Sequence, residues 1–146
     1  MLKQVRRSEL ILDRKTISDY LPHGDAAILI DSIEVFEGTS IVCASSRHHD
    51  LDNPFRVSTD EGSFLPASAI LEFAAQTAAL HATMKLAQLS DASPRQATIA
   101  KISKTRWGTR NLDTVEGKLH IGATCVSRLD GAALYDFSVG EENGAE

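Results

Sequence analysis

The feature that most constrains the fold is the stretch PASAILEFAAQTAALHATMKLAQL, residues 66–89. Alanine and leucine dominate it, and both favour the α-helix strongly. Pro66 suits the first helical turn, where its missing N–H costs no hydrogen bond. Because apolar residues lie on nearly every side of this helix, we expect it to be buried rather than to lie on the surface. The rest of the chain must therefore cover it on most sides.

Segments typical of strands flank this helix and can supply the cover. Before it, residues 26–38 and 39–49 predict a hairpin that turns at Gly38. After it, three further strands are expected, at residues 97–107, 115–129 and 133–139. The economical arrangement is one antiparallel sheet curled around the helix, with a second copy of the fold closing the remaining side. The predicted fold class is α+β.

The strand expected at residues 115–129 has the clearest alternation. Apolar Leu119, Ile121 and Ala123 alternate with polar residues, so one face is buried and the other is solvated. His120 falls on the solvated face.

The length of 146 residues fits one domain, residues 1–146. We expect an ordered core over about residues 16–140 and a polar tail at 141–146. A weak capping pattern predicts a short helix at residues 16–20. The polar residues 50–62 predict a long loop, and such loops are more often functional than accidental.

Charge and hydropathy argue against two classes of partner. The net charge of −5 gives no support for nucleic-acid binding. No stretch approaches the about 18 apolar residues of a membrane-spanning helix. The basic N-terminus lacks the apolar segment of a secretory signal. We therefore expect a cytoplasmic protein that has neither nucleic-acid nor membrane partners.

The cysteines and histidines give no sign of a metal. Cys43 and Cys125 each lie among apolar neighbours and are expected to be buried, reduced thiols. The five histidines and two cysteines do not have the spacing of metal ligands. No metal site is predicted.

Several segments together resemble a known family. YLPHGDAAILIDSIEVFEG, NPFR, LPASAILEFAAQ and IAKISKTRW follow one another in this order. In order and spacing they resemble the FabA/FabZ-like hotdog superfamily of 3-hydroxyacyl-[acyl-carrier-protein] dehydratases, over residues 17–139. The resemblance implies the hotdog fold, with an antiparallel sheet around one central helix. It also places Glu72 and Gln76 on the family's Glu and Gln.

The resemblance has two departures. Standard members carry a catalytic His just before the helix, where this chain has VSTDEGSF. The segment RHHDLDNPFR instead resembles a divergent branch associated with aryl-polyene and related polyketide-type pathways. That resemblance gives His48 the role of the missing His. The family also has one more strand after residues 133–139, where this chain has its polar tail.

The activity that the resemblance implies needs a base and an acid. Dehydration of a 3-hydroxyacyl thioester removes an α-proton and a hydroxyl group, and a His and a carboxyl group can share that work. The apolar neighbours of Glu72 favour its neutral, proton-donating form. Neutral His48 would accept the α-proton. The thioester itself acidifies this proton, so no cofactor is expected.

The alternation of side chains along a strand decides between the two adjacent histidines. If the strand stays extended, His48 shares a face with small residues such as Ala44, whereas His49 shares one with Arg47, which prefers water. This parity favours His48 facing inward. Asp50 either orients the His48 ring or caps a turn.

Other residues are expected to bind the substrate. Backbone N–H groups at the helix start, near Pro66 and Ala67, are donors for the developing enolate oxygen. Gly62 lets the backbone approach the thioester. Gln76 lies one helical turn after Glu72 and can bond to Glu72 or to a dimer partner. His81 lies on another side of the helix and is left out of the site.

The implied partners are an acyl carrier protein with a phosphopantetheine-linked acyl substrate, and a second hotdog chain in a homodimer or heterodimer. His48 of one subunit would then work with Glu72 of the other. A basic cluster can contact the acidic carrier or simply form a solvated strand edge: Lys101, Lys104, Arg106 and Arg110, with Trp107 between them.

Two other functions stay open, as does a purely structural role for the buried Glu72 or for His48. A hotdog thioesterase would use an ionised Glu72 on the thioester and would not require His48. A non-catalytic hotdog subunit would bind a carrier protein or a sister dehydratase. The missing loop histidine favours this last alternative.

Overall fold

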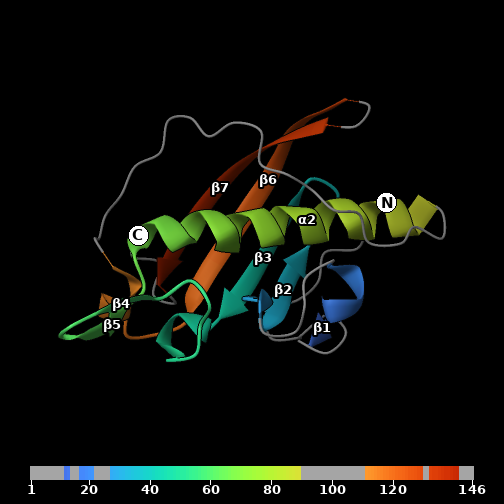
Figure 1. Ribbon diagram of the computed structural model, residues 1–146. Coiled ribbons are helices and arrows are strands. Elements are labelled where there is room, and N and C mark those ends of the chain that lie inside the picture. Colours follow the sequence, from blue (N-terminus) through green and yellow to red (C-terminus); the bar gives the residue numbers. More distant parts are fainter. Residues whose placement is uncertain (1–11, 14–16, 22–26, 90–110, 130–131, 142–146) are drawn as a thin grey trace.

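A computed structural model describes residues 12–13, 17–21, 27–89, 111–129 and 132–141. One long helix, α2 (Ile70–Leu89), lies across a five-stranded antiparallel sheet (Figure 1). The strand order is β1-β2-β3-β6-β7. The strands are β1 (Leu12–Asp13), β2 (Ser32–Phe36), β3 (Ser40–Ser45), β6 (Leu119–Leu129) and β7 (Ala132–Glu141). This is the predicted hotdog arrangement, and the α+β class is confirmed.

The register of the sheet places apolar side chains in rows that face the helix. Cys43 of β3 is opposite Ile121 of β6, which is in turn opposite Val139 of β7. Phe73 and Leu80 of α2 are fully buried in the core that these rows help to form. Complete burial of a side chain of this size stabilises the fold by about 1.5–3 kcal/mol.

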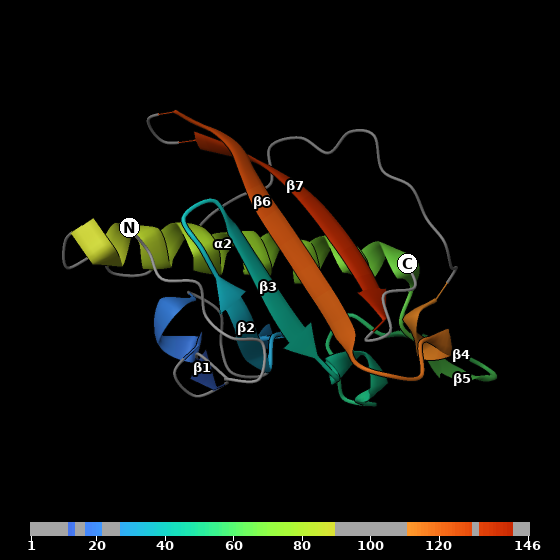
Figure 2. The ribbon, with the colours of Figure 1, turned by 180° about the vertical axis from the view of Figure 1, so that it is seen from behind.

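The helix is buried on one side and only partly on the other. Figure 2 shows the sheet from behind, with all its strands on one side of α2. Phe73, Thr77 and Leu80 are buried, whereas Leu71 and Ala75 keep partial exposure. Burial on nearly every side was predicted, and within the single chain this holds only on the side of the sheet. The strands of one chain therefore cover one face of α2.

Residues 50–62, predicted to be a loop, contain part of a second, small sheet. β4 (Val57–Thr59) pairs with β5 (Gly62–Phe64), and this hairpin projects beside the N-terminal end of α2 (Figure 1). Thr59 Oγ1 donates to the Gly62 carbonyl at 2.8 Å. The prediction missed the hairpin because both strands are short and their side chains are mostly exposed, so they show no alternation of apolar residues.

Strand boundaries also differ from the prediction. The first strand begins at Ser32 rather than at residue 26, and the second ends at Ser45 rather than at residue 49. β7 continues through Gly140 to Glu141, which is the first residue of the expected tail. The expected short helix is a 3₁₀ helix over Ser18–Tyr20. The strand predicted at 97–107 and the basic cluster within 101–110 lie outside the described residues.

Both cysteines are free thiols. Cys43 is completely buried, and burial raises its pKa to about 12. Cys125 is only partly buried, so the predicted burial is right for Cys43 and incomplete for Cys125. Among the described segments, no helix has the length and apolar character needed to cross a membrane.

Candidate functional site

The chain turns sharply where β3 ends, and this turn carries both histidines. Ser45 Oγ donates to the Leu29 carbonyl, and the Ser46 N–H donates to the Asp31 carboxylate at 2.8 Å. These bonds tie the end of β3 to the segment before β2, and the backbone then forms a 3₁₀ helix over Arg47–His49. The strand is therefore not extended at the histidines.

Arg47 is buried, contrary to the prediction that it faces water. Its guanidinium donates to the Ile28 carbonyl at 3.0 Å and pairs with the Asp50 carboxylate at 2.7 Å. A buried charge is tolerated when it is paired in this way. The Asp50 side chain thus pairs with Arg47, and the Asp50 backbone N–H donates to the Arg47 carbonyl at 3.2 Å at the end of the 3₁₀ turn.

His48 is completely buried, whereas His49 is exposed. The predicted inward orientation of His48 therefore agrees with the structure, but the reasoning behind it does not. The parity argument assumed an extended strand, and the 3₁₀ helix replaces that geometry. In the 3₁₀ helix Arg47–His49, the His48 side chain points into the protein and the His49 side chain points toward solvent.

A backbone carbonyl fixes the protonation of the His48 ring. Its Nε2 lies 3.0 Å from the Val115 carbonyl oxygen. A carbonyl only accepts hydrogen bonds, so Nε2 carries the hydrogen and Nδ1 keeps its lone pair. Nδ1 is buried and has no hydrogen-bond partner among the described residues. Burial lowers the pKa of His48, which keeps the ring neutral. This neutral ring can accept a proton at Nδ1.

His49 uses the same carbonyl. Its Nε2 lies 2.6 Å from the Val115 oxygen, and the centroids of the two imidazole rings are 3.9 Å apart. The neighbouring His49 ring disfavours a positive charge on His48, which lowers the pKa of His48 in addition to the larger effect of burial. Val115 was predicted only as a strand residue. A backbone acceptor leaves no mark in the sequence, so this role could not have been found there.

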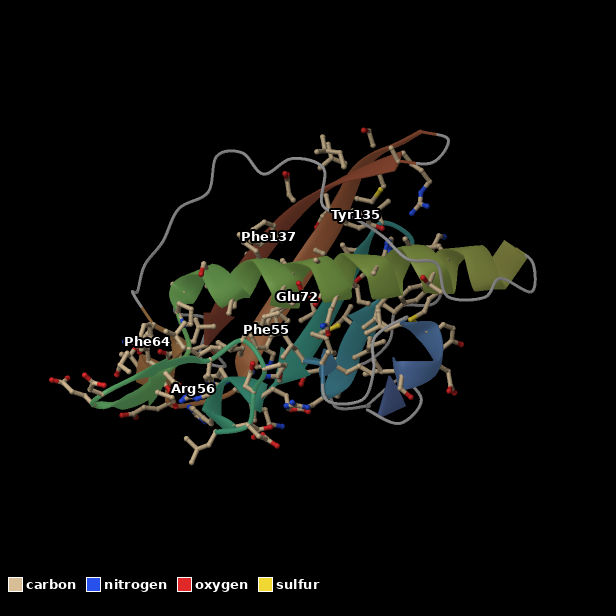
Figure 3. All side chains as sticks on the ribbon, in the orientation of Figure 1. Phe55, Arg56, Phe64, Glu72, Tyr135 and Phe137 are labelled. Carbon is tan, nitrogen blue, oxygen red and sulfur yellow. The ribbon has the colours of Figure 1, made fainter. Side chains whose placement is uncertain are left out.

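Glu72 lies in the first turn of α2 and is partly buried (Figure 3). Gln76 Nε2 lies 3.4 Å from Glu72 Oε1, which is the predicted contact between the two side chains. The burial expected for Glu72 is incomplete within one chain, because the sheet covers only the opposite side of the helix. Complete burial of the Glu72 side chain would require a second chain.

Gln76 also fastens the helix to the segment before β2. Its Oε1 accepts the Leu29 N–H at 2.8 Å, and its Nε2 donates to the Ala27 carbonyl at 2.8 Å. Gln76 is itself buried, so both polar groups of its amide are satisfied inside the protein. These bonds give Gln76 a structural role in addition to the predicted role in substrate binding.

The predicted substrate-binding residues lie around the start of the helix. Pro66 precedes a 3₁₀ helix, Ala67–Ala69, that leads directly into α2. Ala67 is buried. Gly62 lies in the exposed β4–β5 hairpin with a φ of 123°, a conformation that glycine adopts most readily. The hairpin itself therefore accounts for a glycine at position 62.

His81 lies away from these groups, as predicted, and has a structural environment. It is completely buried, with Nε2 at 3.0 Å from the Glu37 carbonyl and Nδ1 at 2.7 Å from the Tyr135 hydroxyl. By the same argument as for His48, Nε2 donates and Nδ1 accepts. Burial lowers the pKa of His81. Its bonds join α2 to β7 and to the turn after β2.

The lowered pKa values make stability depend on pH. His48 and His81 both have folded-state pKa values below the ordinary 6.5, so below this pH the unfolded chain binds more protons than the native protein. We expect the free energy of unfolding to be fully developed above about pH 6.5 and to fall as the pH drops toward the lowered values. Urea unfolding measured over a range of pH tests this.

The variant His81→Leu isolates one contribution. At neutral pH it should lower the free energy of unfolding by about 1–3 kcal/mol, because buried partners lose their hydrogen bonds. At acidic pH the gap from the wild type should narrow, since the variant has no His81 to keep neutral. An equal gap at every pH would contradict the assignment.

Comparison with known proteins supports a specific family. The family model described as ApeP-like, ApeP dehydratase, matches residues 15–146. The structure described as the dehydratase heterocomplex ApeI:P from Xenorhabdus doucetiae is similar, with a TM-score of 0.74 and 17% identity. The match covers 88% of this chain and 82% of that chain. No curated protein sequence matches. At this identity the structural likeness concerns the fold.

Proposed function

Because this chain belongs to the ApeP-like dehydratase family, we propose that it removes water from a 3-hydroxyacyl thioester carried on the phosphopantetheine arm of an acyl carrier protein. The product is the corresponding α,β-unsaturated thioester. The observation that carries this proposal is His48, which is completely buried, has a lowered pKa, and has no hydrogen-bond partner for Nδ1 in the part of the chain that the structure describes. A hydrolase that uses only a carboxylate would have no need of such a ring.

In the proposed reaction, His48 acts as the base. Its Nδ1 takes the α-proton, and the electrons of the C–H bond move toward the thioester carbonyl. The oxygen of the resulting enolate accepts hydrogen bonds from backbone N–H groups near Ala67, where the helix start adds partial positive charge. The Val115 carbonyl then stabilises the imidazolium through Nε2–H.

Glu72 acts as the acid. Its carboxyl group gives a proton to the departing hydroxyl, so that water leaves as the C–O bond breaks and the double bond forms. Both catalytic groups return to their starting states once the proton on His48 is transferred to the Glu72 carboxylate, directly or by exchange through solvent. No metal or cofactor takes part in this scheme. The proposal assigns substrate contacts to Gly62, Pro66, Ala67 and Gln76.

We further propose that each site combines His48 of one subunit with the carboxylate of another hotdog subunit. The partly exposed, apolar side of α2, which includes Leu71 and Ala75, supports this because a second chain would bury it. The similar structure is described as a dehydratase heterocomplex. That description supports a heterodimer with a sister dehydratase, and a homodimer is the alternative.

Turnover of a defined substrate tests the proposed function. The chain, alone and co-expressed with a sister hotdog protein, would be incubated with a 3-hydroxyacyl group loaded on an acyl carrier protein. Mass spectrometry of the carrier is expected to show loss of water with the thioester intact. Release of the free 3-hydroxy acid would instead indicate a thioesterase. Absence of turnover in every combination would indicate a non-catalytic subunit.

A further inference from the structure

Residues 111–115 connect the start of the helix to the two histidines. Asn111 forms a bridge with Pro66, and the Leu112 N–H donates to the Leu65 carbonyl at 2.7 Å. A 3₁₀ helix, Leu112–Thr114, follows, and its C-cap is Val115, which holds both imidazole rings. One end of this short segment therefore pairs with the residues just before α2, and the other end orients His48.

Asp113 fixes the middle of the segment through both carboxylate oxygens. Oδ2 accepts the Leu65 N–H at 2.8 Å. Oδ1 accepts from the guanidinium of Arg56, through NH1 at 2.8 Å and also through NH2. The Arg56 side chain is only 7% exposed, whereas that of Asp113 is 34% exposed, so solvent reaches the pair from the carboxylate side. Figure 3 shows Arg56 beside the β4–β5 hairpin, at the end of the molecule where α2 begins.

Arg56 extends the connection to the small sheet. Its Nε donates to Ser63 Oγ of β5 at 3.3 Å. Asp113 thus joins the loop after the histidines, the β4–β5 hairpin, the start of the helix and the segment that carries the Val115 carbonyl. The sequence gives no sign that Arg56 and Asp113 pair, because they are 57 positions apart along the chain.

We propose that Asp113 is a positioning residue that sets where His48 lies relative to the backbone donors at the start of α2. This inference rests on the proposed roles of His48 and of the N–H groups near Ala67. A carboxylate suits the task because its two oxygens accept from Leu65 and Arg56 separately. Asparagine offers one acceptor oxygen and an NH2 group, which cannot accept from Arg56.

The charge of Asp113 also acts on the ring. Burial is the main influence and lowers the pKa of His48, while the nearby negative charge of Asp113 opposes that effect. Removing the charge should therefore lower the pKa of His48 further. This electrostatic effect reports that the charge lies near the ring, so it separates a carboxylate close to His48 from a remote one.

The test compares Asp113→Asn with the wild type, in the full chain and together with any partner that turnover requires. We expect kcat to fall about 10–100-fold with little change in KM, because the base is displaced from its working position. Asp113→Glu, which keeps both oxygens, should recover part of the loss. The matched control is Asp136→Asn, which removes the same charge from an exposed position on β7 and should leave kcat unchanged. An unchanged kcat in Asp113→Asn would overturn the inference.

A second measurement does not depend on catalysis. Nitrogen-15 NMR of the histidine rings should show, in the wild type, His48 protonated at Nε2 and bare at Nδ1. In Asp113→Asn, its titration should move to lower pH and its Nε2–H should exchange faster. If the wild type shows no dehydration, the proposed function fails, and these spectra still decide the positioning role. Identical His48 signals in the two proteins would overturn it. Should Asp113→Asn fail to fold, Arg56→Gln, which leaves the Leu65 bond in place, is measured in the same two ways.

Discussion

Replacing His48 with asparagine is expected to slow dehydration by about 10²–10⁴-fold, the usual contribution of a general base. The amide of asparagine cannot take the α-proton, while its small polar side chain leaves the surrounding fold largely in place. The rate of formation of the unsaturated thioester measures the effect. Circular dichroism and urea unfolding of the variant show whether any loss comes from misfolding.

His49→Asn provides the matched control. It makes the same change one position along the 3₁₀ helix, in an exposed ring that binds the same Val115 carbonyl. We expect its rate to change only a few-fold, on the order of the loss of one neutral hydrogen bond. If His48→Asn dehydrates at the wild-type rate, His48 is not the base. Hydrolysis that survives in His48→Asn, without dehydration in either protein, would favour the thioesterase alternative.

Mixing two inactive variants should restore activity if each site is shared between chains. Glu72→Gln alone is expected to lower the dehydration rate by about 10²–10⁴-fold, because the amide cannot protonate the leaving hydroxyl. If the protein is a homodimer, a mixed dimer contains one His48→Asn chain and one Glu72→Gln chain. One of its two sites then combines the intact Glu72 of the first chain with the intact His48 of the second. A statistical mixture should then recover roughly a quarter of the wild-type rate.

This result can be interpreted only if the two variant chains are shown to form mixed dimers. Chains with different affinity tags, purified in two steps, give the mixed dimer directly. If that dimer stays inactive, His48 and Glu72 act within one chain or not at all. If the chain forms no homodimer, the same logic applies to the heterodimer, where Glu72→Gln should leave a site built from His48 and the sister's carboxylate untouched.

The long helix could be predicted because the residues within it determine its conformation. The alanines and leucines of residues 66–89 favour a helix whatever surrounds them, and α2 follows that expectation. The alternation in β6 is equally local, and Leu119, Ile121 and Ala123 are buried as expected. The partial exposure of the other side of α2 within one chain follows from the same prediction, which relied on a second copy to cover that side.

The turn that carries the histidines could not be predicted in this way. It is set by contacts from Ser45 to Leu29, from Ser46 to Asp31 and from Arg47 to Ile28, all between segments distant in sequence. General rules place arginine in water, but the Ile28 carbonyl and the Asp50 carboxylate offset that preference for Arg47. The predicted inward orientation of His48 was therefore correct for a reason that the structure does not share.

The acceptor that orients His48 belongs to the main chain, and this has a consequence for how the site can vary. Every amino acid brings the same carbonyl to position 115, so the identity of the side chain there is restricted only by its packing on the core. Relatives could carry another residue that packs there and still keep the ring in the same tautomer. A comparison of conserved residues would then fail to detect this oxygen atom, on which the proposed reaction depends.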